Sequence, residues 1–286
     1  MQNTLKTTIL LAALTGLLIA VGDVLGGRGG MLLFFGIAIV MNVSAYWWSG
    51  DIALRMAGAR EVSPAEAPAL HQLVDELALA AHLPKPRVAI IDSPAPNAFA
   101  TGRDANHAVI AATTGILGIL SRDELAGVLA HELGHVQNHD ILISSVAATI
   151  AGAITLLAHA AQWALIFGGF GGGRDDRDRN PFAALLMIIV APIAASLIQL
   201  AISRSREYSA DAAGAKIQGN PEALARALEK LDQASSVRPL DVNPTMAHMF
   251  IVNPLKNVNF AGLFSTHPPI QERIRRLRAM ELRSVY

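Results

Sequence analysis

The side chains best placed to do chemistry are two histidines and a glutamate in the run His131-Glu132-Leu133-Gly134-His135. On a helix, histidines four residues apart lie one turn above each other, so both imidazoles can reach one zinc ion. Glu132 is rotated by about 100° from His131 and can face the open coordination position, where its carboxylate can accept a proton from water. This HExxH pattern therefore predicts metal-assisted hydrolysis, provided that the run is helical.

A helix is predicted there by a signal that is independent of the motif. Ser121 and Glu124 have the spacing of a capping box, in which each side chain bonds to the backbone of the other residue. We predict that the helix runs from this box through His139. Gly134 in its interior costs about 1 kcal/mol relative to alanine, which suggests close packing beside the site.

A catalytic zinc usually has three protein ligands and one water, so a third side chain must come from elsewhere. His139 stands two turns from His131, too far to close the site, and Ile141 occupies the place of the last metzincin histidine. Glu207 is the better candidate, in a polar segment that directly follows an apolar run. Asp211, one turn further on, could accept a hydrogen bond from a ligand imidazole. Alternatively, Glu207 and Asp211 could simply lie on the solvent-exposed face of a helix.

The composition predicts a membrane protein. Of the 286 residues, 52% are hydrophobic and 16% are charged, against about 25% charged in a typical soluble domain. A formal net charge of zero argues against a nucleic-acid partner, and the absence of cysteine excludes disulfides and thiolate metal sites. Four stretches have the roughly 20 apolar residues that a membrane-spanning helix needs. They are Thr7–Leu25, Met31–Trp48, Ile141–Phe167 and Phe182–Ile202.

The four stretches form two hairpins that divide the chain. Four crossings return the chain to its starting side, so residues 51–140 and 203–286 can form one catalytic domain. Residues 1–50 and 141–202 are then the two membrane hairpins. A cleaved signal peptide after Lys6 is the alternative for the first stretch, but no small-residue cleavage site follows it. Two core helices of a soluble protein are the alternative for the second pair. Basic residues near the spans slightly favour a cytoplasmic catalytic domain.

The segments outside these stretches predict a small α+β unit. Apolar residues recur at helical spacing over residues 64–82, which predicts a helix. The runs Arg87–Ile91 and Ala108–Ala112 are rich in β-branched and small residues and are bounded by Pro, Asp and Gly. Both runs therefore predict strands of a small sheet.

The ordered set of motifs resembles the HtpX family of membrane zinc proteases, relatives of the eukaryotic prenyl-protein endoproteases. The resemblance covers nearly the whole chain. It includes the paired N-terminal spans, Asn97-Ala98-Phe99-Ala100, HELGH, the spacing from Glu207 to Asp211, and Ser265-Thr266-His267-Pro268-Pro269. It implies a mainly α integral membrane protein, with four transmembrane helices and an α+β zincin-like domain of the gluzincin type around a small sheet.

The resemblance also implies an activity and a ligand set. The protein would be an endopeptidase of the bacterial inner membrane that cleaves membrane or misfolded polypeptides in quality control and stress response. One Zn²⁺ ion per chain would be held by His131, His135 and Glu207. Glu132 would be the general base, and Asp211 would support a ligand.

Three further roles follow only from the resemblance. Asn97 would hold a substrate backbone along an edge strand, while His267 and Arg273 would stabilise the oxyanion. Each residue has an ordinary alternative. Asn97 could be a turn residue after Pro96, and His267 could be a helix-entry residue before two prolines. Arg273 could be one member of a basic cluster. The apolar stretch from Met246 to Phe250 could line a substrate groove or pack in the core, and we favour packing.

Two other functions are compatible with parts of the sequence. A metal-binding membrane scaffold without activity would have no need of Glu132, because zinc binding alone does not require that carboxylate. A small ion transporter would need ionisable residues deep inside the spans, but Asp23 and His159 both lie near an end. We therefore expect an enzyme whose partners are polypeptides and the lipid bilayer.

Overall fold

The computed structural model describes residues 2–166, 204–237, 244–252 and 268–284. Helix α1 (Gln2–Trp47) turns back on itself at Gly27, whose φ of 55° and ψ of −142° suit glycine. Its two arms, Thr4–Asp23 and Gly26–Trp47, are long and apolar enough to cross a membrane, with mean hydropathies of 1.9 and 1.7. The first predicted hairpin is therefore present. The fourth predicted span, Phe182–Ile202, lies outside the described residues.

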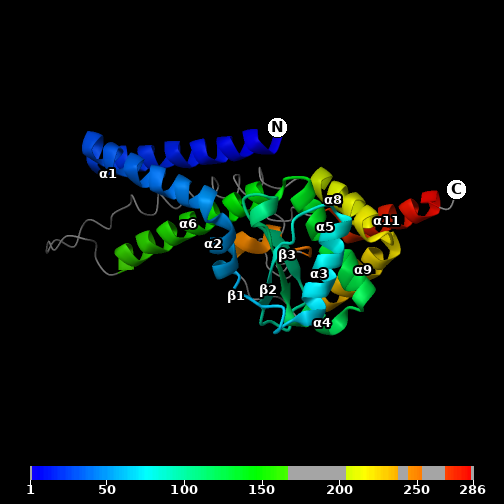
Figure 1. Ribbon diagram of the computed structural model, residues 1–286. Coiled ribbons are helices and arrows are strands. Elements are labelled where there is room, and N and C mark those ends of the chain that lie inside the picture. The colour runs from blue at the N-terminus through cyan, green and yellow to red at the C-terminus, as the bar shows by residue number, and fades with distance from the viewer. Residues whose placement is uncertain (1, 167–203, 238–243, 253–267, 285–286) are drawn as a thin grey trace.

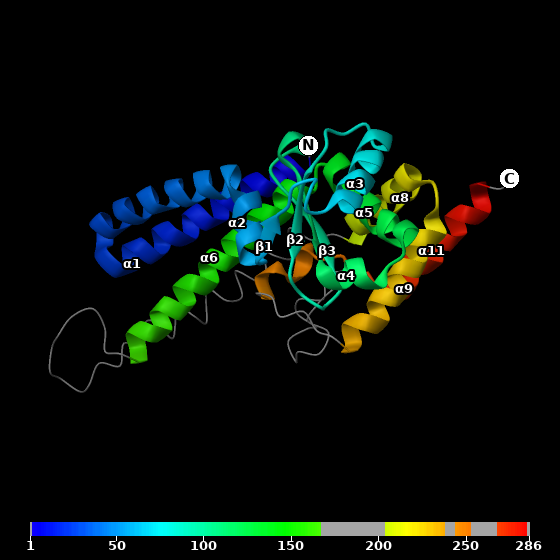
Figure 2. The same ribbon diagram turned by 60° about the horizontal axis from the view of Figure 1, so that its bottom comes forward.

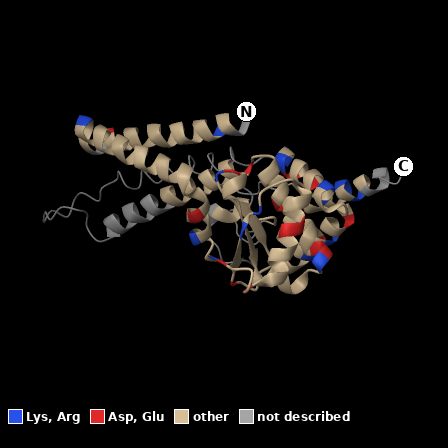
Figure 3. Cartoon of the chain, in the orientation of Figure 1, with Lys and Arg blue, Asp and Glu red and all other residues tan. Residues whose placement is uncertain are grey.

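The hairpin lies beside helix α6 (Ile141–Ile166), and together they extend from the rest of the chain (Figures 1 and 2). Leu10 and Leu14 of α1 are buried against Ile143 and Ile150 of α6. The outer side of α1 exposes large apolar side chains, with Leu32 74% exposed. Figure 3 shows that charged residues gather on the rest of the chain and are sparse on the hairpin. This surface suits lipid contact better than water.

The described residues form a four-stranded sheet in the order β1-β2-β4-β3. The central strands β2 (Arg87–Ile91) and β4 (Val109–Thr113) pair in parallel. The edge strands β1 (Ala59–Glu61) and β3 (Ala98–Thr101) pair antiparallel with them. The first predicted strand is confirmed at its full length, and the second begins and ends one residue later than predicted.

Helices cover both faces of the sheet. Helices α3 (Pro68–Ala80) and α5 (Arg122–Gln137) pack on one face. The other face is covered by α2 (Ser49–Met56) and the 3₁₀-helix η2 (Pro244–Met249). The helix predicted over residues 64–82 corresponds to α3, with a later start at Pro68. Further helices among the described residues are η1 Ala105–His107, α4 Thr114–Ile119, α8 Arg204–Gln218, α9 Pro221–Val237 and α11 Ile270–Ser284.

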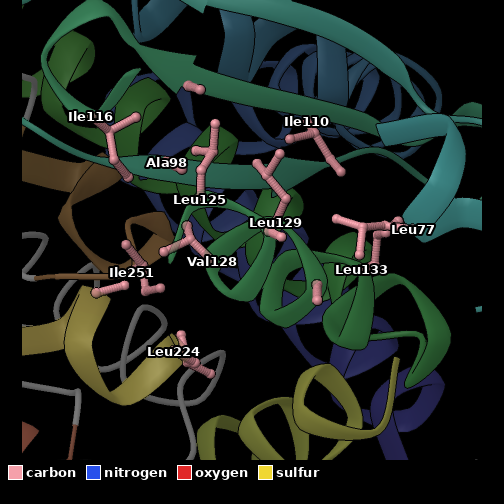
Figure 4. Packing of buried hydrophobic residues seen from close by; sticks show 14 of the residues in the cluster. Leu77, Ala98, Ile110, Ile116, Leu125, Val128, Leu129, Leu133, Leu224 and Ile251 are labelled. Carbon is pink, nitrogen blue, oxygen red and sulfur yellow. The ribbon is translucent and has the colours of Figure 1, made fainter. Parts of the chain in front are cut away.

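Helix α5 is the centre of the main hydrophobic core. Figure 4 shows its side chains directed toward the sheet residue Ile110, toward Leu77 of α3 and toward Leu224 of α9. Its start is the predicted capping box: the backbone N–H of Ser121 donates to Glu124 Oε2 at 2.8 Å. Because α5 is packed on several sides and capped at its start, the side chains along it have fixed directions.

Candidate metal centre and active site

The run from His131 to His135 lies on α5, where this helix crosses α8 with almost no space between the backbones. A Cβ atom on Gly134 would stand 2.8 Å from the carbonyl oxygen of Ala210, and one on Gly214 would stand 2.7 Å from the backbone nitrogen of His131. The close packing predicted from Gly134 is confirmed, and a glycine on α8 matches it. This crossing brings Glu207 of α8 to the histidines of α5.

Three side chains converge on one point. His131 Nε2 lies 3.9 Å from Glu207 Oε2, and His135 Nε2 lies 3.5 Å from Glu207 Oε1. One donor atom from each of these residues lies within 4.8 Å of the others. Ligand atoms about 2.1 Å from a tetrahedral zinc ion are about 3.4 Å apart, so these separations are close to the required ones.

Each histidine also contacts a carboxylate through its other nitrogen. His131 Nδ1 lies 2.9 Å from Asp211 Oδ1, and His135 Nδ1 lies 3.3 Å from Asp140 Oδ2. An Nδ1–H that donates to a carboxylate leaves the Nε2 lone pair directed at the shared point, the arrangement expected of metal-ligating histidines. Asp211 is thus where a supporting acid was predicted, while the role of Asp140 was missed.

Asp140 reaches His135 because α5 ends earlier than predicted. The helix stops at Gln137, and His139 adopts a left-handed φ of 56°. The backbone N–H of Asp140 donates to the carbonyl of His135 at 2.9 Å, and that of His139 donates to Val136, a Schellman motif. The prediction of a helix through His139 was wrong, because this left-handed turn ends α5 before α6 begins.

Arg273 of α11 connects the acids of the centre and is fully buried. It donates to both carboxylate oxygens of Asp211, at 2.9 and 2.7 Å, and its Nη1 lies 3.7 Å from Glu207 Oε2. Nη1 also donates to the carbonyl of Ile251 at 3.1 Å. The guanidinium therefore compensates the two acids of α8 in a largely buried site.

Glu132 is held beside the three candidate ligands by the edge strand. Its Oε2 accepts the backbone N–H of Ala100 in β3 at 2.8 Å, and its side chain is buried. Burial, opposed by nearby His135, raises the pKa of Glu132 to about 8. A divalent cation at the neighbouring ligands would lower this pKa by attraction and favour the ionised carboxylate that a general base needs.

The electrostatics differ between the two histidines. Burial and the positive charge of Arg273 lower the pKa of His131, which favours the neutral imidazole that a metal requires. Burial alone would lower the pKa of His135, but Asp140 and Glu207 raise it to about 9. A metal must therefore displace a proton from His135, so metal affinity should fall as the pH falls below about 9.

The charge of the centre suits a divalent cation. Four carboxylates lie together and face two guanidinium groups, namely Glu132, Asp140, Glu207, Asp211, Arg206 and Arg273. The raised pKa values of Glu132 and His135 place a proton on each at neutral pH, and loss of these two protons would leave an excess of two negative charges for a divalent cation to neutralise. Two imidazole nitrogens and a carboxylate oxygen form a donor set typical of zinc in hydrolases. The residues present therefore fit a metal ion.

The remaining predicted site residues lie in different places. Asn97 is buried at the start of β3, with its side chain bonded to the backbone of Val252. Arg273 is bonded to Asp211 beside the candidate ligands. His267 lies outside the described residues.

The close crossing of α5 and α8 gives a testable consequence. In Gly214→Ala, the new methyl group must separate the two backbones, so we expect a loss of about 1–3 kcal/mol in unfolding free energy. Zinc affinity should also fall, because Glu207 moves with α8. The control is Gly118→Ala in α4, where no atom lies within 4 Å of the added Cβ. Equal stability and zinc affinity in the two variants, measured by denaturation and metal titration, would contradict this account of the crossing.

Comparison with known proteins decides the family. The family model described as Peptidase family M48 matches residues 64–281, which include every candidate ligand. The chain belongs to this family. As an M48 peptidase it is a metalloprotease, a hydrolase that acts on polypeptides.

Relatives extend the likeness to the whole chain. A "Protease HtpX homolog" of Syntrophotalea carbinolica is 57% identical, over 98% of this chain and 99% of that protein. Another of the same description, from Pyrococcus furiosus, is 55% identical over 98% of both chains. The predicted resemblance to HtpX is thereby confirmed. With the two apolar arms of α1, it makes the M48 chain a membrane protease.

A solved structure shares the fold. The M48 chain superimposes on the crystal structure of S. mikatae Ste24p with a TM-score of 0.51 at 23% identity. The match covers 96% of this chain and 64% of the other. The overall arrangement, a helical protein with a small mixed sheet, is therefore a known one.

Proposed function

We propose that the protein is a zinc-dependent endopeptidase, embedded in a membrane, that hydrolyses membrane or misfolded polypeptides. The observation that carries the proposal is the convergence of three ligand atoms within 4.8 Å of one another, beside a buried glutamate. A scaffold would not need Glu132 in that place. The similarity to the HtpX homologues supports a role in membrane quality control and stress response.

The proposed ligands are His131, His135 and Glu207, with one Zn²⁺ per chain. Zinc held there would polarise the peptide carbonyl and lower the pKa of a water molecule toward neutrality. Glu132 accepts the proton from the attacking water while the water oxygen forms a bond to the carbonyl carbon. The same carboxylate then passes the proton to the nitrogen of the breaking C–N bond, so the base returns to its ionised form.

Other residues of the centre orient these groups. Asp211 and Asp140 fix the histidine tautomers, and Arg273 compensates the buried acids of α8. We assign Arg273 to this positioning role in place of the oxyanion role that the resemblance implies, because its guanidinium already binds Asp211 and Ile251. His267 remains the candidate for stabilising the oxyanion.

The position of the centre suits substrates in or near a bilayer. His135 lies only six residues before Ile141, the first residue of the apolar helix α6, and Ile141 lines the catalytic cavity. We propose that four membrane helices, in residues 1–50 and 141–202, carry a zincin-like domain formed by residues 51–140 and 203–286. In a bacterial inner membrane this domain would face the cytoplasm.

Removal of the metal tests the proposal. Treatment of the purified protein with a chelator should abolish casein cleavage and lower the unfolding free energy, because the ion neutralises buried carboxylates. One equivalent of Zn²⁺ should restore both properties. Casein cleavage that persists at zinc contents below one-tenth of an ion per chain would refute zinc dependence.

A further inference from the structure

Most of η2 and the three residues that follow it wrap around the free edge of the sheet. We call residues 246–252 the strap; all of them are buried. Met246 and Phe250 pack on one face of the sheet, where the ring of Phe250 meets that of Phe99 edge-on at 5.2 Å. Ile251 and Val252 join the core on the opposite face. The strap therefore crosses the edge strand β3 beside the active site.

The backbone of the strap is bonded as an added strand would be. The N–H of Ile251 donates to the carbonyl of Ala98 at 3.1 Å. The side chain of Asn97 forms two hydrogen bonds with the backbone of Val252. Its Nδ2 donates to the carbonyl at 2.8 Å, and its Oδ1 accepts the N–H at 3.4 Å. The Asn97 amide thus binds a peptide backbone, as the family resemblance implies, but this backbone belongs to the chain itself.

The strap also forms a wall of the catalytic cavity. This cavity contains about 360 Å³ of empty space, including the part open to solvent. The candidate ligands and Glu132 form its polar side, whereas Met249, Phe250 and Ile251 contribute apolar surface. His248, also in the wall, lies with Nε2 3.2 Å from the carbonyl of Ser144, which ties the strap to α6. A substrate side chain that enters the cavity on this side would lie against this surface.

We propose that the strap selects an apolar side chain next to the scissile peptide bond through Met249, and that Asn97 is the positioning residue that fixes the strap. The inference rests on the proposed endopeptidase function and adds the class of side chain that the site accepts. Met249 is the member of the wall best suited to contact it, because its flexible apolar side chain is free of the ring stacking that holds Phe250.

The first test compares two methionines of the strap. Met249 lines the cavity, whereas Met246 is fully buried and does not line it. Cleavage sites in casein are first mapped by mass spectrometry with the zinc-loaded full chain. Two peptides are then compared that carry leucine or glycine beside the mapped bond. We expect Met249→Ala to lower the leucine-over-glycine ratio of kcat/KM about tenfold and Met246→Ala to keep it within twofold.

The outcomes separate this inference from the proposed function. If wild-type protein cuts casein but its ratio is near one, or if Met249→Ala keeps the wild-type ratio, the specificity role of Met249 is wrong while the peptidase stands. The loss of cleavage on zinc removal tests the proposed function and is measured separately. Met249→Gln, which keeps the length of the side chain, replaces Met249→Ala if the latter does not fold, with the same expected fall in the ratio.

The second test concerns Asn97 and uses a readout independent of activity. In Asn97→Ala, hydrogen exchange at the Val252 amide of the full chain should accelerate at least tenfold, and the leucine-over-glycine ratio should fall as in Met249→Ala. If Asn97 instead contacts the substrate backbone, KM should rise equally for both peptides and exchange in the strap should not change. That second result would overturn the assignment.

Discussion

Replacement of Glu132 by glutamine is expected to lower kcat for casein cleavage by about 10²–10⁴-fold while zinc content stays at one ion per chain. Glutamine keeps the size of the side chain and can still accept the N–H of Ala100, but it cannot take a proton from water. The decrease should therefore appear without loss of metal or of folded protein. Cleavage rates, zinc analysis and thermal unfolding of the same preparation measure the three quantities.

A second buried glutamate on the same helix provides the matched control. Glu124 accepts hydrogen bonds from Ser121 and from Lys230, two turns before the motif. Glu124→Gln should reduce stability and leave cleavage per folded molecule unchanged. If Glu132→Gln cuts casein as fast as Glu124→Gln does, the general base has been misassigned.

Replacement of Arg273 by methionine is expected to lower the unfolding free energy of the zinc-free protein by about 3–5 kcal/mol. The buried cation is lost, so among the described residues Asp211 keeps only its contact with His131, and Glu207 keeps only Arg206 as a nearby guanidinium group. Burial would raise the pKa of Asp211, but Arg273 and His131 hold it at about 2. In the variant this pKa should rise, and part of the lost stability should return as the pH falls and Asp211 is protonated.

The neighbouring Arg275 serves as the control, because its side chain is 76% exposed and bonds Glu272 on the surface. Arg275→Met should unfold at nearly the wild-type denaturant concentration. Denaturant unfolding in detergent micelles, at two pH values, compares the variants. Equal stabilities for Arg273→Met and Arg275→Met would show that the buried network does not support the centre.

Local sequence signals predicted the parts of the site that depend on a single helix. The HExxH spacing, the capping box at Ser121 and Glu124, and the tight packing at Gly134 all follow from helical geometry over short separations. The strand Arg87–Ile91 was predicted for a similar reason, because its pattern is contained in five residues. Glu207 was indicated by its place after an apolar run, and α8 brings its carboxylate to the two histidines.

Features that depend on turns or distant partners were not predictable in the same way. Asp140 reaches His135 through a left-handed turn at His139, where glycine or asparagine would have signalled the helix end and histidine does not. The partner of Asn97 lies 155 residues away at Val252, beyond the reach of any local pattern. The segment from Met246 to Phe250 packs in the core, as we favoured, and the substrate groove stays a prediction, although Met249 lines the cavity.

X-ray absorption at the zinc K-edge, on full-length protein with one ion per chain, would show which side chains bind the ion. We expect two imidazoles and one carboxylate around the ion in the wild-type protein. In Glu207→Ala the carboxylate should be lost from this shell, and zinc should bind at least tenfold more weakly. An identical shell and affinity in Glu207→Ala would show that Glu207 is not a ligand.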